Sequence, residues 1–520
     1  MKGLIEEEEE QKEKRDKWER LHDALIVIST KEAALFMFDI IVHSQQKIIA
    51  VSRIRKHLTS DSDNDLIRYA KKLSGCLLQA GALKFFKDTE KEFTITHLCI
   101  SSMAAIVIEN NAKESNTTTG PLLSTTTTIP YSRPVLEERK FFSTIIENVI
   151  ANLTRLMKDK DLARLFENCW PNTLDTTVAW TKFDGNYPKT FIITGDIPAM
   201  WLRDSTNQDP YSNAFRAPNE TNIPYEENPW SKTDKVIPKP SNSTWESKWE
   251  VDSLASFLKL SFNYWQSTKD ERFLKMEIWK KAVTTILETF EIQRLGTFEE
   301  LNNEHYLFTR ETRTSTETLL LYGKGNPVRR TGLIKSQFRP SDDSTTFPFL
   351  IPSNAMASVE LEHLSKMLNK TYPDLAKKAF EMAIDIRTAI VSLSIVHHQK
   401  FREIFVYEID GYGSTNLMDD ANIPSLLSLP YLGFLDKNDQ IYQNTRQFIL
   451  SDWNKYYFEN FQEGQQQQKY KGVGSPHSGL DDQEILDTLE YLKSSSSNTG
   501  LIHESFWYKD SNNFTRPWFA

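Results

Sequence analysis

Amphipathic helical patterns follow one another from about residue 135 to the end of this chain, with long polar connections between them. Apolar side chains recur every three or four positions in these segments, the period of an α-helix that buries one face. Strand-like patterns are sparse and lie mainly at residues 189–194 and 402–410. We therefore expect a mainly α body of helical hairpins around a pocket, with the chemistry on the loops. The predicted helices lie within residues 137–157, 252–268, 277–295, 355–369, 373–395, 438–453 and 483–494.

The chain is long enough for more than one domain, because 520 residues exceed the size at which a single hydrophobic core stops growing. Residues 115–134 are rich in Ser, Thr and Pro and lack helical periodicity, which predicts an exposed linker. Residues 1–114 then form a small N-terminal domain, α or α+β, and residues 135–520 form the main domain. Helical patterns and a possible hairpin at residues 82–96 are typical of a winged helix. We prefer the alternative of a helical adaptor without a nucleic-acid role, because such patterns do not fix a topology.

Charge and cysteine spacing exclude several function classes. The net charge of −9 and pI near 5.7 create no overall attraction to phosphate backbones or anionic lipids, so no nucleic-acid partner is expected for the main domain. Cys76, Cys99 and Cys169 show no C-x-x-C spacing, which argues against a zinc site or a disulfide framework and predicts free thiols. No H-x-x-x-H or D-x-D-x-D-G spacing and no phosphate-binding glycine loop occur, so no metal or other cofactor is expected. We draw no prediction of the oligomeric state.

The compartment is open between two alternatives. The N-terminal charge run has no apolar segment behind it, and no stretch of about 18 uncharged apolar residues occurs. Neither a signal peptide nor a membrane span is therefore predicted, and a cytoplasmic location is the default. The secretory pathway is the alternative, because the chain contains N-x-[ST] sequons. They begin at Asn116, Asn152, Asn219, Asn242, Asn369 and Asn513.

Acidic and aromatic residues occur together in clusters on the expected loops. Carboxylates beside Trp, Arg, Asn and His suit a polyhydroxylated ligand, because Asp and Arg bind vicinal hydroxyls and an indole packs on the apolar face of a pyranose. Such a combination in five places of one chain indicates a sugar-binding site. The members are Asp196, Trp201, Arg203, Asp204 and Gln208; Trp249, Glu250 and Asp252; Asp419, Asp420 and Asn422; His477; and His503 and Glu504.

Two adjacent aspartates, Asp342 and Asp343, are candidates for an acid catalyst. Cleavage of a glycosidic bond requires one protonated carboxyl for the leaving oxygen and one carboxylate across the ring. A neighbouring like charge raises a carboxyl pKa, which helps one of the pair to keep its proton near neutrality. The alternative is simple capping of the helix expected downstream, and for an isolated Ser-Asp-Asp we favour capping.

The other clusters also have structural interpretations. The Trp-Leu-Arg-Asp segment could be a buried ion pair under an indole, and lone histidines such as His477 and His503 are more often structural than ligand-binding. Asp419 and Asp420 could serve a turn ahead of Pro424.

Several strings, taken in order, resemble glycoside hydrolase family 125, in particular its fungal members. The resemblance covers most of residues 135–520 and rests on "FENCWPNTLDTTV", "TGDIPAMWLRDSTNQ", "KWEVDSL", "TGLIKSQFRPSDD", "IPSNAMA", "MDDANIPSLLSLPYLG", "GVGSPHSG" and "TGLIHESF". It implies an (α/α)6 barrel and an exo-acting, inverting α-1,6-mannosidase that needs no metal. It places the general acid in "RPSDD", at Asp342 or Asp343, and the general base at Glu504. The substrate, a mannose-containing oligosaccharide or N-glycan, would be held by Asp196, Trp201, Arg203, Asp204, Glu250, Asp252, Arg339, Asp420, Asn422, His477 and His503.

The sequence departs from the family pattern at three places. Gln208 is joined directly to Asp209, where the family has a further helical segment, and Gly479 is joined to Leu480, where a Trp- and Pro-containing helix is expected. The C-terminal end also falls short of a final helix. Because these segments are missing, we expect an incomplete barrel. A missing wall would expose apolar faces and admit water to the site. The alternatives to an active mannosidase are a catalytically impaired glycan-binding relative and an N-terminal interaction module fused to a hydrolase remnant.

Overall fold

The computed structural model describes the chain from residue 128 onward, with gaps. The described residues are 128–183, 188–193, 197–201, 210–217, 223–300, 305–420, 422–459, 471–472, 482–503, 506–507 and 510–514. The predicted N-terminal domain and most of the predicted linker lie outside them, so both stay predictions. None of the described helices combines the length and the apolar character needed to cross a membrane.

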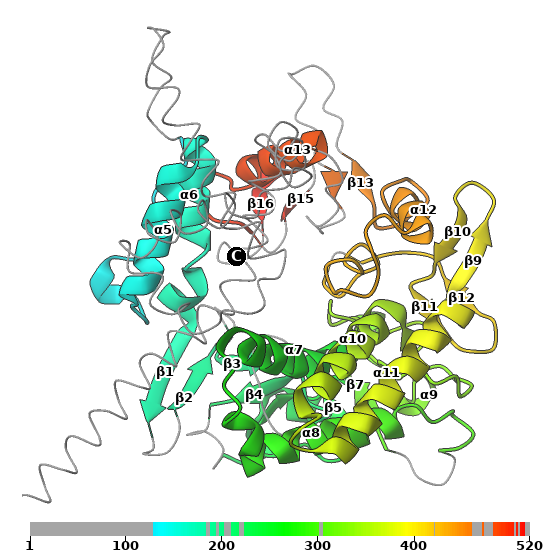
Figure 1. Ribbon diagram of the computed structural model, residues 1–520. Helices are drawn as coiled ribbons and strands as arrows, with labels where there is room; N and C mark the ends of the chain where they lie inside the picture. Colours follow the sequence, from blue (N-terminus) through cyan, green and yellow to red (C-terminus); the bar gives the residue numbers. More distant parts are fainter. Residues whose placement is uncertain are drawn as a thin grey trace, which may run out of the picture.

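Helices dominate the described residues, and each of the seven predicted segments contains one (Figure 1). The ten-residue helix α6 was not predicted. Its N-cap is Asp159, whose Oδ1 accepts a hydrogen bond from Leu162 N at 2.9 Å. The helices are α5 (Thr144–Leu156), α6 (Lys160–Cys169), α7 (Val251–Thr268), α8 (Glu277–Ile292), α9 (Leu320–Gly323), α10 (Ile351–Leu368), α11 (Pro373–Leu393), α12 (Gln440–Ile449) and α13 (Asp482–Ser494).

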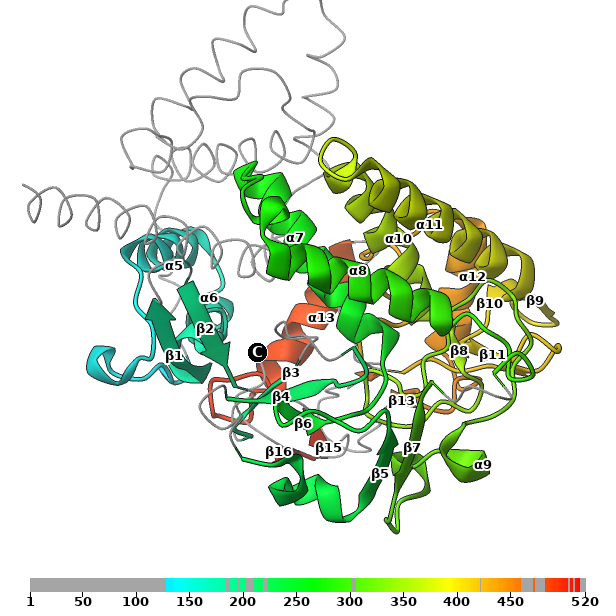
Figure 2. The same cartoon turned by 90° about the horizontal axis from the view of Figure 1, so that it is seen from below.

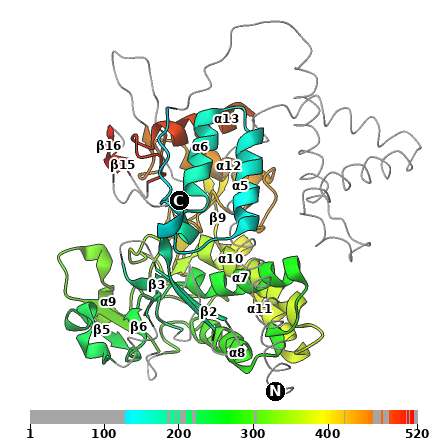
Figure 3. The same ribbon diagram turned by 90° about the vertical axis from the view of Figure 1, so that its left-hand side faces the viewer.

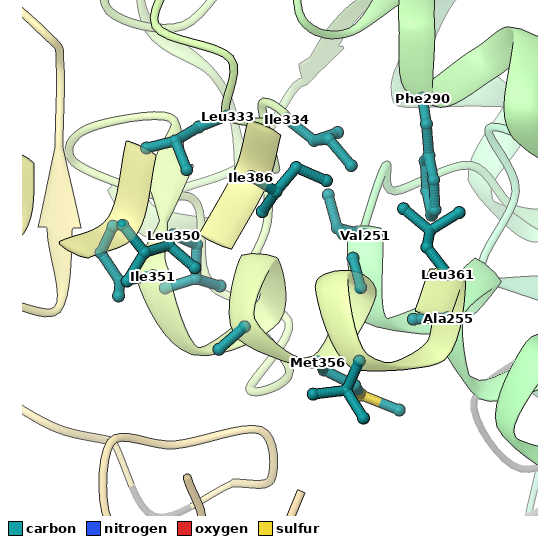
Figure 4. Close-up of a cluster of buried hydrophobic side chains, with 14 of the residues drawn as sticks. Val251, Ala255, Phe290, Leu333, Ile334, Leu350, Ile351, Met356, Leu361 and Ile386 are labelled. Carbon is teal, nitrogen blue, oxygen red and sulfur yellow. The ribbon is translucent and has the colours of Figure 1, made fainter. Parts of the chain in front are cut away.

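Helix α10 is the centre of the main hydrophobic core. Its residues from Ile351 to Leu361 are buried without interruption, so it contacts other elements on all sides, as an inner helix does. Figure 4 shows its side chains between those of α7, α8 and α11, with Val251, Phe290 and Ile386 facing the same core. The outer helix α11 starts with proline at its first position, where the fixed φ favours a helix and no N–H is lost.

The helices α7 and α10 begin side by side. Ser353 in the first turn of α10 donates a hydrogen bond from Oγ to Oδ1 of Asp252 in the first turn of α7, at 3.1 Å. Both N-termini therefore lie at one end of the bundle. The loops that precede these helices meet at this end, and they carry several of the predicted site residues.

The described part of the chain follows a circuit and returns to its first helices. In Figure 1 the colours run from cyan through green, yellow and orange to red, and the red α13 lies beside the cyan α6. Figure 3 shows α5, α6 and α13 together from the side. Lys493 Nζ lies 2.5 Å from Asp159 Oδ2, and Asn168 Nδ2 donates to Gly500 O at 2.8 Å. These contacts join the first helical hairpin to the last described segment.

Short antiparallel strands form small sheets on one side of the helices (Figure 2). The predicted strands at 189–194 and 402–410 are confirmed as β2 and as β10 with β11, but the structure contains many more. Most have two to four residues, too few for alternation to be recognised in the sequence. The strands are β1 (Val178–Phe183), β2 (Pro188–Ile192), β3 (Ala199–Trp201), β4 (Ala214–Arg216), β5 (Asp234–Ile237), β6 (Thr244–Glu246), β7 (Leu307–Arg310), β8 (Phe349–Leu350), β9 (Ile395–His398), β10 (Arg402–Phe405), β11 (Glu408–Ile409), β12 (Thr415–Asn416), β13 (Phe458–Glu459), β14 (Lys471–Gly472), β15 (Phe506–Trp507) and β16 (Asp510–Phe514).

Candidate active site

The two adjacent aspartates lie in a tight loop that precedes α10. Asp342 N donates to Arg339 O at 2.9 Å, and Arg339 N donates to Asp343 O at 2.8 Å. Asp342 has a φ of 67°, in the left-handed region that non-glycine residues rarely occupy. The favoured prediction of a helix cap is wrong, because α10 begins at Ile351, after Leu350, without a side-chain cap. Contacts with distant residues hold this loop, and a local sequence pattern cannot reveal them.

Arg339 lies at the start of the same loop and is anchored by a buried glutamate from another part of the chain. Its Nε lies 2.7 Å from Oε1 of Glu408, which is fully buried, and its guanidinium lies 5.5 Å from the centre of the Tyr407 ring. Burial by itself would lower the pKa of Arg339, but the adjacent Glu408 carboxylate raises that pKa overall. The guanidinium is therefore a permanent positive charge beside the two aspartates.

Trp249 joins the start of α7 to the segment that leads into the loop. Its indole Nε1 donates to Lys335 O at 2.6 Å, and its carbonyl accepts hydrogen bonds from Gln337 N and Phe338 N. Glu250 and Asp252, on either side of the helix start, are 1% and 0% exposed. Asp252 in the first turn and Glu250 at the N-cap both lie at the positive end of the helix dipole, which stabilises carboxylates.

Lys248 connects the start of α7 with the aspartate loop. Its Nζ donates to the backbone carbonyl of Asp342 at 3.0 Å and lies 3.7 Å from Glu246 Oε1. Glu246 is also paired with Arg310 Nη2 at 2.8 Å, and Arg310 forms a bidentate pair with Asp234. Burial opposes ionisation of Glu246, yet the Lys248 and Arg310 charges hold its pKa below the ordinary value.

Asp419 and Asp420 have different environments. Asp419 is fully buried, and its carboxyl accepts hydrogen bonds from Leu426 N and Leu427 N, beyond Pro424, at 2.9 and 3.1 Å. The turn role ahead of Pro424 stays a prediction, because these bonds go to residues that follow the proline. Burial raises the pKa of Asp419 to about 8. Asp420 is partly exposed, and its negative charge acts on Arg339. Its Oδ1 accepts two long hydrogen bonds of 3.4 Å from Asn422.

A metal site is not evident in the part of the chain that the structure describes, where no three His, Cys, Asp or Glu side chains are grouped for an ion. A groove of about 440 Å³ lies along β5 and β7 and is lined by Asp234, Lys239, Thr309 and Tyr322 among others. None of the predicted site residues that the structure describes lines this groove, and we assign the chemistry to the loops instead.

The comparison with known protein families decides what kind of protein carries this arrangement. The family model described as metal-independent alpha-mannosidase (GH125) matches residues 159–209 and 206–520. The chain belongs to glycoside hydrolase family 125. The resemblance seen in the sequence is confirmed, and the family places the chain among glycoside hydrolases that act on mannose.

Two GH125-related comparisons cover most of the main domain. The meiotically up-regulated gene 157 protein of Schizosaccharomyces pombe is 40% identical over 457 residues, with 77% of this chain and 87% of the relative covered. A solved structure from Streptococcus pneumoniae, a metal-independent alpha mannosidase in a non-productive complex with alpha-1,6-mannobiose, is 29% identical with a TM-score of 0.65. The match covers 73% of this chain and 96% of that one. The predicted (α/α)6 fold class is confirmed, and the circuit of hairpins in Figure 1 agrees with it.

Most of the described residues of the GH125 motifs lie in one group. It contains Glu250, Asp252, Arg339, Asp342, Asp343 and Asp420, joined through Lys248, Glu408 and the paired helix starts. His503 lies in a separate segment, where its Nε2 lies 3.2 Å from Ser496 O and its ring stacks on Phe514. Trp201, on β3, is 9% exposed and packs with Ala199 and Ala214. Asp196, Arg203, Asp204, His477 and Glu504 lie outside the described residues, so their positions stay predictions.

Several buried charged residues of this site were not predicted from the sequence. Glu408 lies in "IFVYEID", where it interrupts an apolar run, and that interruption is the signal that could have identified it. Glu246 and Lys248 precede the predicted Trp249; Lys248 opens the motif "KWEVDSL" but was not singled out, and Glu246 belongs to no motif. Arg310 ends a short strand, and only the folded chain brings it to Glu246.

Cys169, predicted as a free thiol, is free and buried, and burial raises its pKa to about 12.

Proposed function

We propose that this chain removes non-reducing terminal α-1,6-linked mannose from oligosaccharides or N-glycans, with inversion at the anomeric carbon. The observation that carries the proposal is the grouping of GH125 motifs around the Asp342–Asp343 loop, in a chain similar to a mannosidase solved with alpha-1,6-mannobiose. One aspartate of the loop donates the proton to the leaving oxygen. Glu504 acts as the general base and activates a water on the opposite face of the sugar.

The environment of the loop favours this division of roles. A general acid must hold its proton near neutral pH and lie within hydrogen-bond reach of the leaving oxygen. The positive charges of Arg339 and Lys248 lie beside the loop, but Lys248 contacts a backbone carbonyl and Arg339 pairs with Glu408. The carboxylates of Glu408 and Glu246, which lie against these two cations, offset part of their positive charge at the loop. Inversion requires about 6.5–9.5 Å between the acid and base carboxyls, which leaves room for the attacking water.

The test is mannose release from α-1,6-mannobiose by the full chain. We expect β-mannose as the first product in proton NMR, and loss of release in Glu504→Gln by about two to four orders of magnitude with folding retained. Asp342→Asn and Asp343→Asn are compared with each other, and the acid is the one whose loss abolishes activity. Intact mannobiose with folded wild-type protein would refute hydrolysis, and α-mannose as the first product would refute inversion.

The second candidate function is glycan binding without turnover. The GH125 match comes in two segments that meet at residues 206–209, at the joint where a family helix is expected to be missing. An incomplete wall favours binding over catalysis, because misplacement of catalytic groups by about 1 Å can cost on the order of a hundredfold in rate. Saturable mannobiose binding without release selects this candidate. A separate role for residues 1–114 stays a prediction, since they precede the family match and the described residues.

A further inference from the structure

Arg339 presents unused hydrogen-bond donors at the aspartate loop. The residue is 6% exposed, and its Nε donates to Glu408. Its two terminal nitrogens make no hydrogen bond with any described residue. A guanidinium fixed at Nε, with its terminal nitrogens available, is suited to donate to neighbouring hydroxyls of one sugar. The orientation of these donors therefore depends on the residue that binds Nε.

Glu408 binds both ends of the loop that carries the two aspartates. One carboxylate oxygen accepts from Arg339 at the start of the loop, at 2.7 Å. The other oxygen accepts from Thr346 N at 3.1 Å and Phe347 N at 3.2 Å, at the end of the loop, and from Asn416 Nδ2 at 2.9 Å. A single side chain thus closes the loop around Asp342 and Asp343.

The backbone of Glu408 is itself fixed. It lies on β11, the central strand of a three-stranded sheet, where it pairs with Leu350 of β8 and with Asn416 of β12. The Glu408 side chain is fully buried, and the neighbouring Tyr407 ring packs under the Arg339 guanidinium. The anchor is therefore rigid on the side of the core, which a positioning role requires.

We propose that Glu408 is a positioning residue for glycoside cleavage: it orients Arg339 toward the sugar and holds the Asp342–Asp343 loop where its acid reaches the leaving oxygen. This inference rests on the proposed function. Glu408 contacts neither the substrate nor the reacting atoms in this role, and its effect passes through Arg339 and the loop. A merely structural glutamate would affect the amount of folded protein and leave the activity of each folded molecule unchanged.

The test compares Glu408→Gln with wild type on two substrates. α-1,6-Mannobiose needs a proton for its leaving oxygen, whereas 2,4-dinitrophenyl α-mannoside releases a stable anion without one. For Glu408→Gln we expect kcat/KM on mannobiose to fall on the order of tenfold to a hundredfold. The fall on the activated substrate should be at least about threefold smaller, because acid positioning does not contribute there and the loss of Arg339 orientation does.

Glu360→Gln is the matched control. Glu360 is also a buried glutamate with one strong partner, His363 Nδ1 at 3.0 Å, but it lies on α10 away from the loop contacts. We expect it to leave the ratio of the two activities unchanged. A Glu408→Gln variant that reduces both activities equally, or neither, overturns the positioning role and leaves the proposed function intact. A folded wild-type protein that cleaves neither substrate refutes the proposed function, and the positioning role with it.

Discussion

A substitution at Gly500 tests whether the segment around this residue packs against the α5–α6 hairpin. It has a φ of +73°, and a Cβ added there would lie 2.6 Å from Pro130 O, 2.6 Å from Ser132 Oγ and 2.7 Å from Asn168 Nδ2. Real Cβ contacts are essentially never that short. The change Gly500→Ala should therefore force the last segment away from α6.

The size of the effect follows from these contacts. An alanine in the left-handed region costs about 1–2 kcal/mol. Overpacking adds about 1–3 kcal/mol, and the two hydrogen bonds of Asn168 Nδ2 to Pro130 O and Gly500 O, each 2.8 Å, contribute about 1 kcal/mol each. We expect a total loss of about 4–7 kcal/mol in the free energy of unfolding.

Gly433→Ala is the matched control. Its φ is +80°, close to that of Gly500, but the nearest atom to an added Cβ is Val359 Cγ1 at 3.8 Å, an ordinary contact. The control should lose only the backbone cost of about 1–2 kcal/mol. Urea unfolding followed by circular dichroism measures both variants. If Gly500→Ala loses no more than Gly433→Ala, the close packing between Gly500 and the first hairpin is wrong.

Two further predictions concern buried charges. Arg310→Met should cost about 3–5 kcal/mol in unfolding free energy because it removes the bidentate partner of the buried Asp234 and leaves the buried Glu246 with only the more distant Lys248, whereas Arg330→Met, which breaks an exposed pair with Glu299, should cost less than about 1 kcal/mol. Equal losses would contradict the buried network. Asp419 has a pKa of about 8 in the folded chain and about 3.9 in an unfolded one, so the folded state binds more protons between these values. Wild-type stability relative to Asp419→Asn should therefore fall as the pH rises from about 4 to 8, by at most about 1.4 kcal/mol per pH unit, and denaturation curves with the same pH slope would refute the shift.

The sequence predicted the long helices well because their burial has a period that local residues reveal. Helices α7 and α11 lie within one or two residues of the predicted limits, since each has one apolar face against the core. Helix α6 was missed because it is short and rich in charged residues, and because part of its stabilisation comes from Lys493 of α13, which pairs with the N-cap Asp159 from more than 300 positions later. Strands of two or three residues were missed for a similar reason: their partners, not their patterns, define them.

The residues of the candidate site were predicted more completely than their arrangement. Motifs identified Arg339, Asp342 and Asp343, but the local pattern favoured a helix cap where the structure has a closed turn. The turn depends on Lys248 and Glu408, which lie 94 and 66 positions from Asp342. Lys248 belongs to the motif "KWEVDSL" but was not singled out, and Glu408 belongs to no motif. Long-range hydrogen bonds to buried charges have no signature in a single sequence, apart from an acid in an otherwise apolar strand.

The arrangement of the chain explains why the two halves of the proposed reaction depend on different parts of the fold. The Asp342–Asp343 loop, which is proposed to carry the acid, is held by contacts within the core formed by α7, α10 and β11, far from either end of the described chain. The predicted base Glu504 directly follows His503, whose segment is held by contacts to α6 through Gly500. Changes at Glu408 should therefore impair proton donation while the base stretch stays in place. Changes at Gly500 should displace the stretch of the predicted base while the Asp342–Asp343 loop stays closed. The activities on activated and unactivated mannosides should therefore fall by the same factor in Gly500→Ala. In Glu408→Gln the activity on the unactivated mannoside should fall more.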